Sequence, residues 1–415
     1  MRLHFLRISI IGPILLLLCS LTVGTAGAAS TAQANHSGHP VFNKSKLSLV
    51  LQPHRTVHIS ASVLDTSQSG THYLYIDDGT CPDSIDVYKT GATLTHVGNY
   101  PNNGCTGSIY FGASTLAVAP TNSNHGNCLI FADTAGFVDS FPINSDGTLG
   151  AEFTHLATQS GGFPSDVAIA ANGLAIVSVP TVDLESYDIG AGCALTYLHS
   201  TYTNSAGDIP FYASITPIGN NLVGAESSGS VGSIDSFRLA SDGSITPLSV
   251  VQGQTTAAAS VVYDTIPASG KTLYRVFVGY ANPGPSSVEG GKYDKATGGI
   301  TFLNGSPSFD PRGSNGGSLF MDIATKVVIQ GQQYSGTLGN YNVKGPTMSF
   351  MRETKMAVSG EYPNNFIQLG STLFVNMITN GDIEACSLTQ TGASNCKSVA
   401  VLTSTNGFSA GTALL

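Results

Sequence analysis

The chain has 415 residues, only 10% of them charged, with 48 glycines, 19 prolines and a formal net charge of −9 at pH 7. Sequence-independent nucleic-acid binding needs a basic face, so the acidic balance argues against that class of function. The shortage of strong helix formers likewise argues against a helical bundle.

The first predicted element is a secretory signal peptide over residues 1–28. Arg2 and Arg7 give a basic start, an apolar stretch runs from Ile8 to Val23, and Ala26-Gly27-Ala28 supplies small residues for cleavage. We therefore expect a secreted protein, or a periplasmic one if the host has an outer membrane, with no membrane association after cleavage. Residues 29–46 are polar and predict a flexible leader before one domain over residues 47–415.

One short phrase then recurs along the chain: an apolar strand that ends in an aromatic residue, followed by polar turn residues and another strand. Copies end at Tyr88, Phe141, Tyr187 and Phe237, weaker ones end at Tyr293 and Tyr341, and the last ends at Cys386. The spacing is about fifty residues throughout, and Asp-Gly or Thr-Gly turns follow most copies, as in β-hairpins. The repeat predicts an all-β fold, a seven-bladed β-propeller with four-stranded antiparallel blades.

The fourth unit shows the four strands most clearly. Alternating or wholly apolar runs cover Tyr212–Pro217, Asn221–Ala225, Ser233–Leu239 and Thr246–Val251. A pair of β-sandwiches is the alternative architecture, but it does not explain seven units with one period. A closed ring has to join its termini, and both Lys46–Gln52 and Gly407–Leu415 resemble strands that could complete a mixed blade.

Six cysteines follow the signal peptide, and an even number in an exported chain predicts disulfides. In a propeller, the linkers between blades and the loops between second and third strands lie on one face, which we call the linker face. The other two loop types lie on the opposite face. Sorting the cysteines by face predicts the pairs Cys81–Cys105 and Cys386–Cys396, and also Cys128–Cys193 between neighbouring blades.

The repeats resemble the lactonase-type propeller family, which includes bacterial 6-phosphogluconolactonase and fungal muconate-lactonising enzymes. The resemblance rests on phrases such as the fourth copy with its turn, residues 234–248, and runs through most of residues 56–404. It implies a central cleft in which histidines, an arginine and a glutamate act on a lactone ring by proton transfer and charge stabilisation.

The chain departs from the family at most of these positions. The His-Pro-His-like motif reads Phe163-Pro164-Ser165-Asp166, and the Pro-Arg-His-like motif reads Ile209-Pro210-Phe211-Tyr212. Of the Asn-Glu pair, Glu226 remains, after Ala225. The resemblance therefore places Glu226 as the candidate catalytic group. Asp166, Phe211 and Tyr212 are the candidate binding residues of the cleft.

Other polar residues give weaker indications. Asp77, Asp78, Asp83 and Asp86 could hold calcium, but solvated turn acids are the favoured interpretation. Arg275 and Arg312 could bind an anion, but surface positions are favoured. His54 and His58 lie four residues apart in a strand pattern, so we predict no metal site there, and no cofactor.

Two functions remain open. The favoured one is a secreted, lactonase-like propeller that serves as a non-catalytic or ligand-binding scaffold for a small molecule, glycan or protein at one face. The alternative is a divergent lactone hydrolase or isomerase that works in the central cleft around Glu226. A different enzyme, such as a lyase on extracellular polysaccharide, is the third possibility. Neither nucleic acid nor membrane is expected as a partner.

Overall fold

Antiparallel hairpins make up almost the whole structure, a computed structural model that describes residues 41–43, 71–79, 83–91, 93–101, 108–110, 114–207, 211–227, 232–253, 258–268, 271–281, 285–359, 362–402 and 411–415. The chain divides into two compact units, Met1–Gln33 and Ala34–Leu415, and every described residue belongs to the second. The predicted signal peptide, the strand Lys46–Gln52 and the pair Cys81–Cys105 lie outside the described residues, as does the predicted leader apart from residues 41–43.

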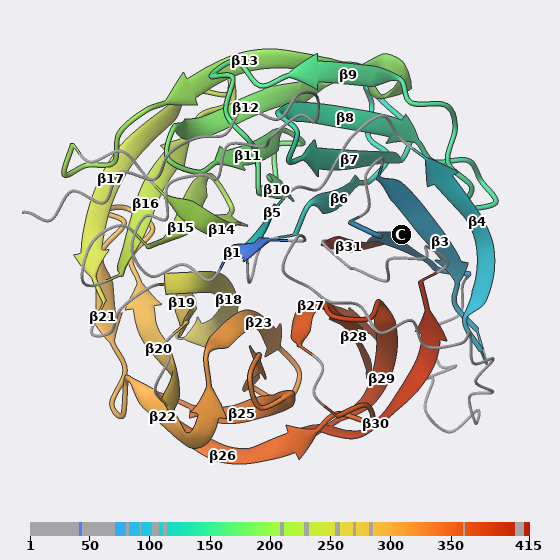
Figure 1. The fold of residues 1–415 in the computed structure, drawn as a ribbon. Helices are drawn as coiled ribbons and strands as arrows, with labels where there is room; N and C mark the ends of the chain where they lie inside the picture. The colour runs from blue at the N-terminus through green and yellow to red at the C-terminus, as the bar shows by residue number, and fades with distance from the viewer. Residues whose placement is uncertain are drawn as a thin grey trace, which may run out of the picture. The chain divides into compact units, whose positions relative to one another are not determined.

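Within the described residues, seven sheets of four or five strands form the blades (Figure 1). From the innermost strand outward, blade 1 is β31 (Gly411–Leu414), β2 (Tyr73–Asp77), β3 (Ser84–Lys89) and β4 (Thr95–Pro101). Blade 2 is β6 (Leu116–Ala119), β7 (Cys128–Asp133), β8 (Phe137–Pro142) and β9 (Thr154–Ala157). Blade 3 is β10 (Asp166–Ile169), β11 (Ala175–Val179), β12 (Asp183–Ile189) and β13 (Leu195–Thr201), with the 3₁₀ turn η2 (Ala191–Cys193) before the last strand.

Blade 4 is β14 (Tyr212–Ile218), β15 (Asn221–Glu226), β16 (Ser233–Leu239) and β17 (Ile245–Gln252). Blade 5 is β18 (Ala258–Ala268), β19 (Lys271–Tyr280), β20 (Pro285–Tyr293) and β21 (Ile300–Phe302), and β22 (Ser308–Ser314) also pairs with β20. Blade 6 is β23 (Gly316–Asp322), β24 (Val327–Gln332), β25 (Thr337–Lys344) and β26 (Thr347–Lys355). Blade 7 is β27 (Pro363–Leu369), β28 (Thr372–Met377), β29 (Asp382–Thr389) and β30 (Gly392–Val401), and a short pair joins β1 (Val41–Asn43) to β5 (Ser108–Tyr110).

The predicted ring of seven blades is confirmed. The innermost strands contact one another in the cyclic order β6, β10, β14, β18, β23, β27, β31 and back to β6. The C-terminal strand β31 lies beside β2, so the chain end completes the first blade, as one of the two closure options predicted. The strands of blade 4 match their predicted ranges to within one residue, and separate β-sandwich cores are absent from the described part of the chain.

The core is divided among the interfaces between blades. Seven large apolar clusters each combine side chains of two neighbouring blades. One of them joins Leu74 and Ile76 of blade 1 to Phe374 and Ile383 of blade 7, which closes the ring through packing. A single blade cannot bury both of its faces, so blade association provides most of the hydrophobic stabilisation.

In blades 3 and 7, the acid of the repeated phrase holds the linker from the preceding blade. Glu185 of blade 3 accepts hydrogen bonds from the backbone N–H groups of Gln159 (3.1 Å) and Ser160 (2.9 Å). Glu384 of blade 7 does the same for Ala357 (2.8 Å) and Val358 (2.9 Å). These carboxylates are fully buried, and each satisfies backbone donors that would otherwise be left without partners.

Blade 6 lacks the acid and uses another solution. Gly339 stands at the position of the acid, and a Cβ there would lie 2.5 Å from Nε2 of Gln332. That amide instead donates a hydrogen bond of 2.7 Å to Asp310, which belongs to β22 of the preceding blade. The carboxylate therefore comes from the linker side, and the bond between the blades is preserved.

The small residue of the phrase holds the blade that follows. Ser186 donates to the carbonyl of Gly243 (2.7 Å), and Ser236 donates to that of Gly298 (3.1 Å). Both glycines have positive φ in the turns between third and fourth strands, a conformation that glycine adopts without strain. The repeated phrase and the repeated turn are therefore the two halves of one contact between blades.

Two of the three predicted disulfides lie within the described residues, and both are present. Cys128–Cys193 joins blade 2 to blade 3, with a Cα–Cα distance of 5.7 Å, and Cys386–Cys396 crosses the β29–β30 hairpin. Their positions agree with the predicted sorting of loops between two faces. Among the described residues, no helix has the length and apolar character needed to cross a membrane.

Candidate functional site

Asp166 opens the innermost strand of blade 3, and its carboxyl group links three blades. One oxygen accepts the backbone N–H of Ser114 (2.8 Å), which leads into blade 2, and the other accepts that of Ile215 (2.7 Å) in blade 4. The side chain is buried. Burial raises the pKa of Asp166 to about 8, although the hydrogen bonds from Ser114, Ile215 and Val167 oppose this shift.

Asp166 is one member of a belt of polar side chains that joins every pair of neighbouring blades, mostly through their inner strands. Other contacts between neighbouring blades are Thr412–Ser114, Ser214–Val261, Ser260–Leu319, Ser318–Asn364 and Asn376–Thr412. With the two bonds of Asp166, they run once round the ring. The inner-strand residues that the resemblance associates with a cleft therefore connect the blades.

Glu226 ends the second strand of blade 4, as predicted, and pairs across the sheet with Tyr212. Only 3% of the residue is exposed. The hydroxyl of Ser233 lies 3.2 Å from the Glu226 carboxylate and 2.7 Å from that of Asp235. A serine hydroxyl donates one proton, so it serves these two acids one at a time.

Tyr212 and Phe211 are also enclosed. The Tyr212 hydroxyl donates to Asp235 at 2.6 Å, and its ring packs edge to face against Phe237. Phe211 is 6% exposed. The structure thus brings Glu226 and Tyr212 together around Asp235, an acid that the sequence analysis did not single out for chemistry. Asp166 instead contacts the backbone of Ser114 and Ile215.

The acidic group near the start of blade 1 differs from its prediction. Asp77, Asp78, Asp83 and Asp86 are all fully buried, so solvated turn acids was the wrong interpretation. Carboxylate oxygens of the first three lie within 4.8 Å of one another, whereas Asp86 contacts His96 and Asn99. Local donors already serve the cluster, because Asp77 accepts Thr115 Oγ1 at 2.7 Å and Asp78 accepts Ser84 N at 3.1 Å.

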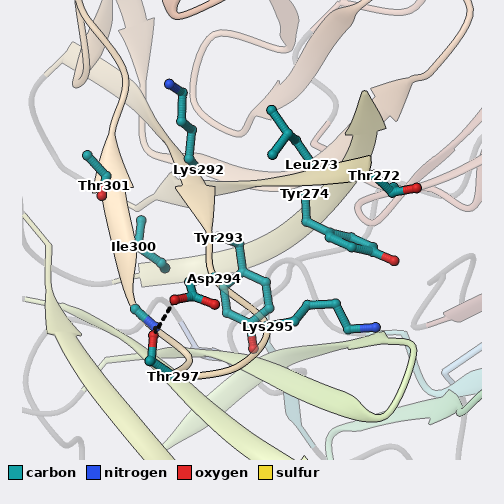
Figure 2. A pocket seen from close by; sticks show the side chains of 11 residues that line it. Thr272, Leu273, Tyr274, Lys292, Tyr293, Asp294, Lys295, Thr297, Ile300 and Thr301 are labelled. Carbon is teal, nitrogen blue, oxygen red and sulfur yellow. Dashed lines mark hydrogen bonds between the residues drawn. The ribbon is translucent and has the colours of Figure 1, made fainter. Parts of the chain in front are cut away.

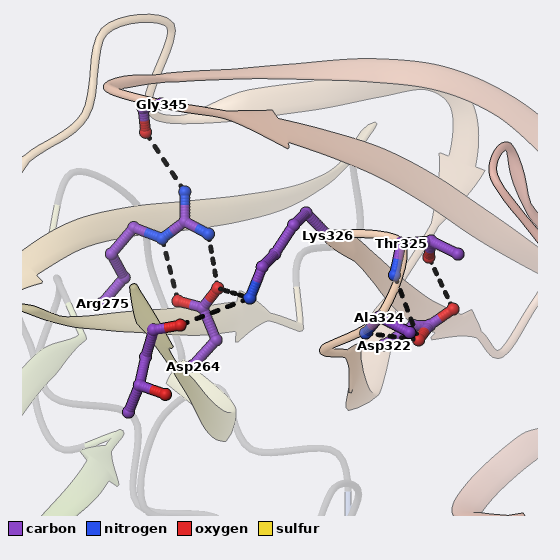
Figure 3. A network of polar contacts seen from close by, with 8 residues as sticks. Asp264, Arg275, Asp322, Ala324, Thr325, Lys326 and Gly345 are labelled. Carbon is purple, nitrogen blue, oxygen red and sulfur yellow. Dashed lines mark hydrogen bonds and ion pairs between the residues drawn. The ribbon is translucent and has the colours of Figure 1, made fainter. Parts of the chain in front are cut away.

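The predicted surface position of Arg275 is wrong. This side chain is 2% exposed, and its Nε donates to Asp264 at 2.8 Å (Figure 3). Lys326 of blade 6 reaches the same carboxylate at 3.3 Å, and Arg275 also donates to the carbonyl of Gly345. The network fastens blade 5 to blade 6, so the arginine is engaged in a structural contact.

Arg312 has the predicted surface position. Its side chain is 68% exposed, and Nε lies 3.0 Å from Glu353. An exposed ion pair of this kind contributes little stability.

A shallow groove of about 550 Å³ lies on the flank of blade 5, away from all the predicted residues. Figure 2 shows Tyr274, Tyr293, Lys292 and Lys295 among the side chains that line it. The ammonium of Lys295 lies 4.8 Å from the centre of the Tyr274 ring, a cation–π contact. No strongly shifted acid or base is described in its lining, so the groove offers a surface and no evident chemistry.

Exposed aromatic side chains gather at one end of the blades. Phe163, Tyr202, Phe309 and Tyr334 are 44% to 60% exposed. Phe163 and Tyr202 lie in linkers between blades, Tyr334 lies in a loop between second and third strands, and Phe309 lies on β22, between blades 5 and 6 along the chain. They therefore share the linker face. Phe153, on a turn between third and fourth strands, belongs to the opposite face. Sequence reasoning missed this gathering, because single aromatics in loops give no signal until topology sorts the loops.

Comparisons with known proteins place the fold. No family model matches the chain, and no curated protein matches it. Among solved structures, a Bacteroides fragilis protein to which 6-phosphogluconolactonase activity has been attributed has a TM-score of 0.63 at 12% identity, covering 85% of this chain and 100% of its own. A periplasmic gluconolactonase of Pseudomonas aeruginosa and a Lactobacillus plantarum protein each have a TM-score of 0.62 at 14% identity, covering 83% of this chain and 99% of theirs.

These similarities show that the chain has the fold of lactonase-like seven-bladed propellers, with a strongly divergent sequence. Identity this low carries the architecture alone. The chemistry has to be argued from the residues of this chain.

Proposed function

We propose that this protein is an exported propeller that binds a ligand on its linker face and performs no lactone chemistry. The observation that carries the proposal is the fate of the motif positions. Asp166 accepts backbone N–H groups from two neighbouring blades, and Tyr212 donates to Asp235. The first side chain links three blades, and the second joins two strands within blade 4.

Lactone chemistry needs an accessible acid or base and a donor or cation beside the developing charge. Glu226 has 3% of its surface exposed, and Phe211 stands where the resembled family carries a cation. The nearby polar groups Ser233 and Asp235 add no positive charge. The environment therefore suits a buried structural acid better than a proton-transfer group.

The linker face is suited to binding because of Phe163, Tyr202, Phe309 and Tyr334. Aromatic rings offer large rigid surfaces at low entropic cost, and their faces stack against the C–H groups of sugar rings. Only 10% of the chain is charged, so few charged side chains are available to recognise an ionic ligand. This combination favours a neutral carbohydrate as the ligand.

Export is the second part of the proposal. The disulfides Cys128–Cys193 and Cys386–Cys396 support it, because such bonds persist in oxidising compartments. The sequence prediction of a signal peptide over residues 1–28 points the same way. Fractionation of the native host would test it, and a reduced protein retained in the cytosol would contradict it.

The test of binding compares variants of the two faces. Phe163→Ala and Tyr334→Ala each remove an exposed ring from the linker face, and Phe153→Ala removes one from the opposite face as the matched control. We expect the wild type to bind soluble oligosaccharides on a glycan array. Each linker-face variant should lose affinity about fivefold or more, and Phe153→Ala should not. Equal losses in all three variants, or no saccharide binding by the wild type, would refute the assignment.

A further inference from the structure

The third and fourth strands of blade 2 bring together one histidine and two acids that neither the fold nor the proposed function uses. Asp139 lies in the middle of β8, and His155 faces it across the sheet on β9. Nδ1 of His155 is 2.8 Å from an oxygen of Asp139 and 3.2 Å from Oε1 of Glu152. One potential ligand atom from each residue lies within 4.8 Å of the others.

The cluster is short of positive charge and of hydrogen-bond donors. The Asp139 side chain is fully buried and its second oxygen receives no hydrogen bond, while Oε1 of Glu152 has the 3.2 Å contact with His155 alone. Within the described residues, the ion pairs of this cluster involve His155 alone, with no lysine or arginine. Buried carboxylates without donors are costly unless a proton or a cation compensates them.

We propose that Asp139, Glu152 and His155 bind a divalent transition-metal ion, and that zinc fits this ligand set best. Imidazole nitrogen with carboxylate oxygens is a donor set that zinc accepts, whereas calcium and magnesium prefer oxygen alone. An ion about 2.1 Å from each atom of a tetrahedral set keeps them roughly 3.4 Å apart. The present distances of 2.8 and 3.2 Å need to widen by only a few tenths of an ångström.

The surroundings suit an ion that enters from solvent. His155 and Glu152 have 37% and 19% of their side chains exposed, so a fourth position can be filled by water. The imidazole stacks on Phe137 with ring centres 4.0 Å apart, which fixes its orientation. A held ring and a buried carboxylate supply a partly preorganised site.

Blade 1 provides an internal comparison. Asp86 and His96 also make a contact of 3.1 Å between the third and fourth strands, but the residue opposite Asp86 in the sheet is Asn99, whose amide donates to Asp86 at 3.0 Å. A neutral donor compensates that carboxylate and offers no anionic ligand. Blade 2 thus has a histidine–aspartate contact with a second acid beside it, and blade 1 has such a contact without one.

The test is isothermal titration of ZnCl₂ into untagged protein that has been treated with a chelator and dialysed, with MnCl₂ and CaCl₂ as further probes. We expect one zinc ion per chain and weaker binding of calcium. His155→Phe keeps a stacking ring and removes the nitrogen, and Glu152→Gln removes one anionic ligand. Each should weaken zinc binding by more than about tenfold, because changes even outside the ligand shell cost that much.

His96→Ala is the matched control and should leave zinc affinity unchanged. Far-ultraviolet circular dichroism and the melting temperature of each apo variant establish that it has folded; His155 is exposed and Glu152 is half-buried. Of the two histidine variants, only His155→Phe should change the visible spectrum of the cobalt-substituted protein. Absence of a stoichiometric zinc site, or one that survives both blade 2 substitutions, would overturn the proposal.

Discussion

At the scale of single residues, each position of the repeated phrase makes its own kind of contact. The acid satisfies the linker before the blade, as Glu185 and Glu384 show, and the small residue bonds the turn of the blade after it, as Ser186 shows. The aromatic fills the core between blades, since Tyr187 and Phe237 are fully buried. A phrase that identifies the fold in the sequence therefore also encodes the contacts that close it.

Asp166 should be a stability residue. Asp166→Ala leaves the N–H groups of Ser114 and Ile215 without their acceptor, and each orphaned donor costs about 1 to 3 kcal/mol. We expect the free energy of unfolding to fall by about 2 to 4 kcal/mol in urea titrations. Asp188→Ala, at an exposed position of the same blade, should change it by less than about 0.5 kcal/mol. A similar small effect in both variants would show that Asp166 is not part of the framework.

At the scale of strands and hairpins, the sequence was a strong guide. Apolar alternation and Asp-Gly turns located the strands of blade 4 to within a residue, because local pattern and local structure share the same period. Sorting loops by face also predicted Cys128–Cys193, although 65 residues separate the two positions. Both predictions depend on the order of the strands in a blade, which the repeat makes evident in the sequence.

The chemistry of side chains was harder to predict. Arginine is usually found at the surface, but Arg275 forms an ion pair with Asp264 in the interior. No local sequence pattern indicates that pairing. Asp139, Glu152 and His155 likewise come together through the pairing of two strands with an irregular segment before the second. A fold-level resemblance could place Glu226 at its strand end but could not reveal that Ser233 and Asp235 enclose it.

The two described disulfides should differ in their effect on stability. The chain-entropy model gives about 4 kcal/mol for the long loop closed by Cys128–Cys193 and about 3 kcal/mol for the hairpin bond. Replacing Cys128 and Cys193 by alanine should therefore lower the denaturation midpoint further than replacing Cys386 and Cys396. Chemical unfolding of the two double variants measures this order. The reverse order would indicate that blade packing already fixes the interface between blades 2 and 3.

At the scale of the whole molecule, buried acids link stability to pH. Burial raises the pKa of Asp166 to about 8 and that of Asp183 to about 7, in both cases from 3.8. The folded state therefore binds more protons than the unfolded state between about pH 4 and these values. Its stability falls as pH rises through that window, by at most about 1.4 kcal/mol per pH unit for each proton.

We expect the urea midpoint to be higher at pH 5 than at pH 8, and Asp183→Asn to reduce the difference. Measuring the midpoint at one-unit steps of pH in constant ionic strength tests this. A midpoint that rises steadily from pH 5 to pH 8 would mean that these acids are ionised in the folded protein and stabilised by their hydrogen-bond donors.

The whole ring also bears on function, because the same inner strands cannot easily form both a belt of contacts between blades and an open catalytic cleft. The belt runs from Thr412 past Ser114 and Asp166 and returns through Asn376. The fold of a lactonase-like propeller is thus retained, while the side chains at its motif positions serve the framework.

The most direct test of this account is the turnover of a panel of lactones, including sugar lactones, sugar-phosphate lactones and muconolactone, by the purified wild-type protein. We predict no hydrolysis or isomerisation above the rate without protein, and no difference between the wild type and Glu226→Gln. Turnover of any lactone that Glu226→Gln abolishes without lowering the melting temperature would contradict the account and establish the cleft as an active site.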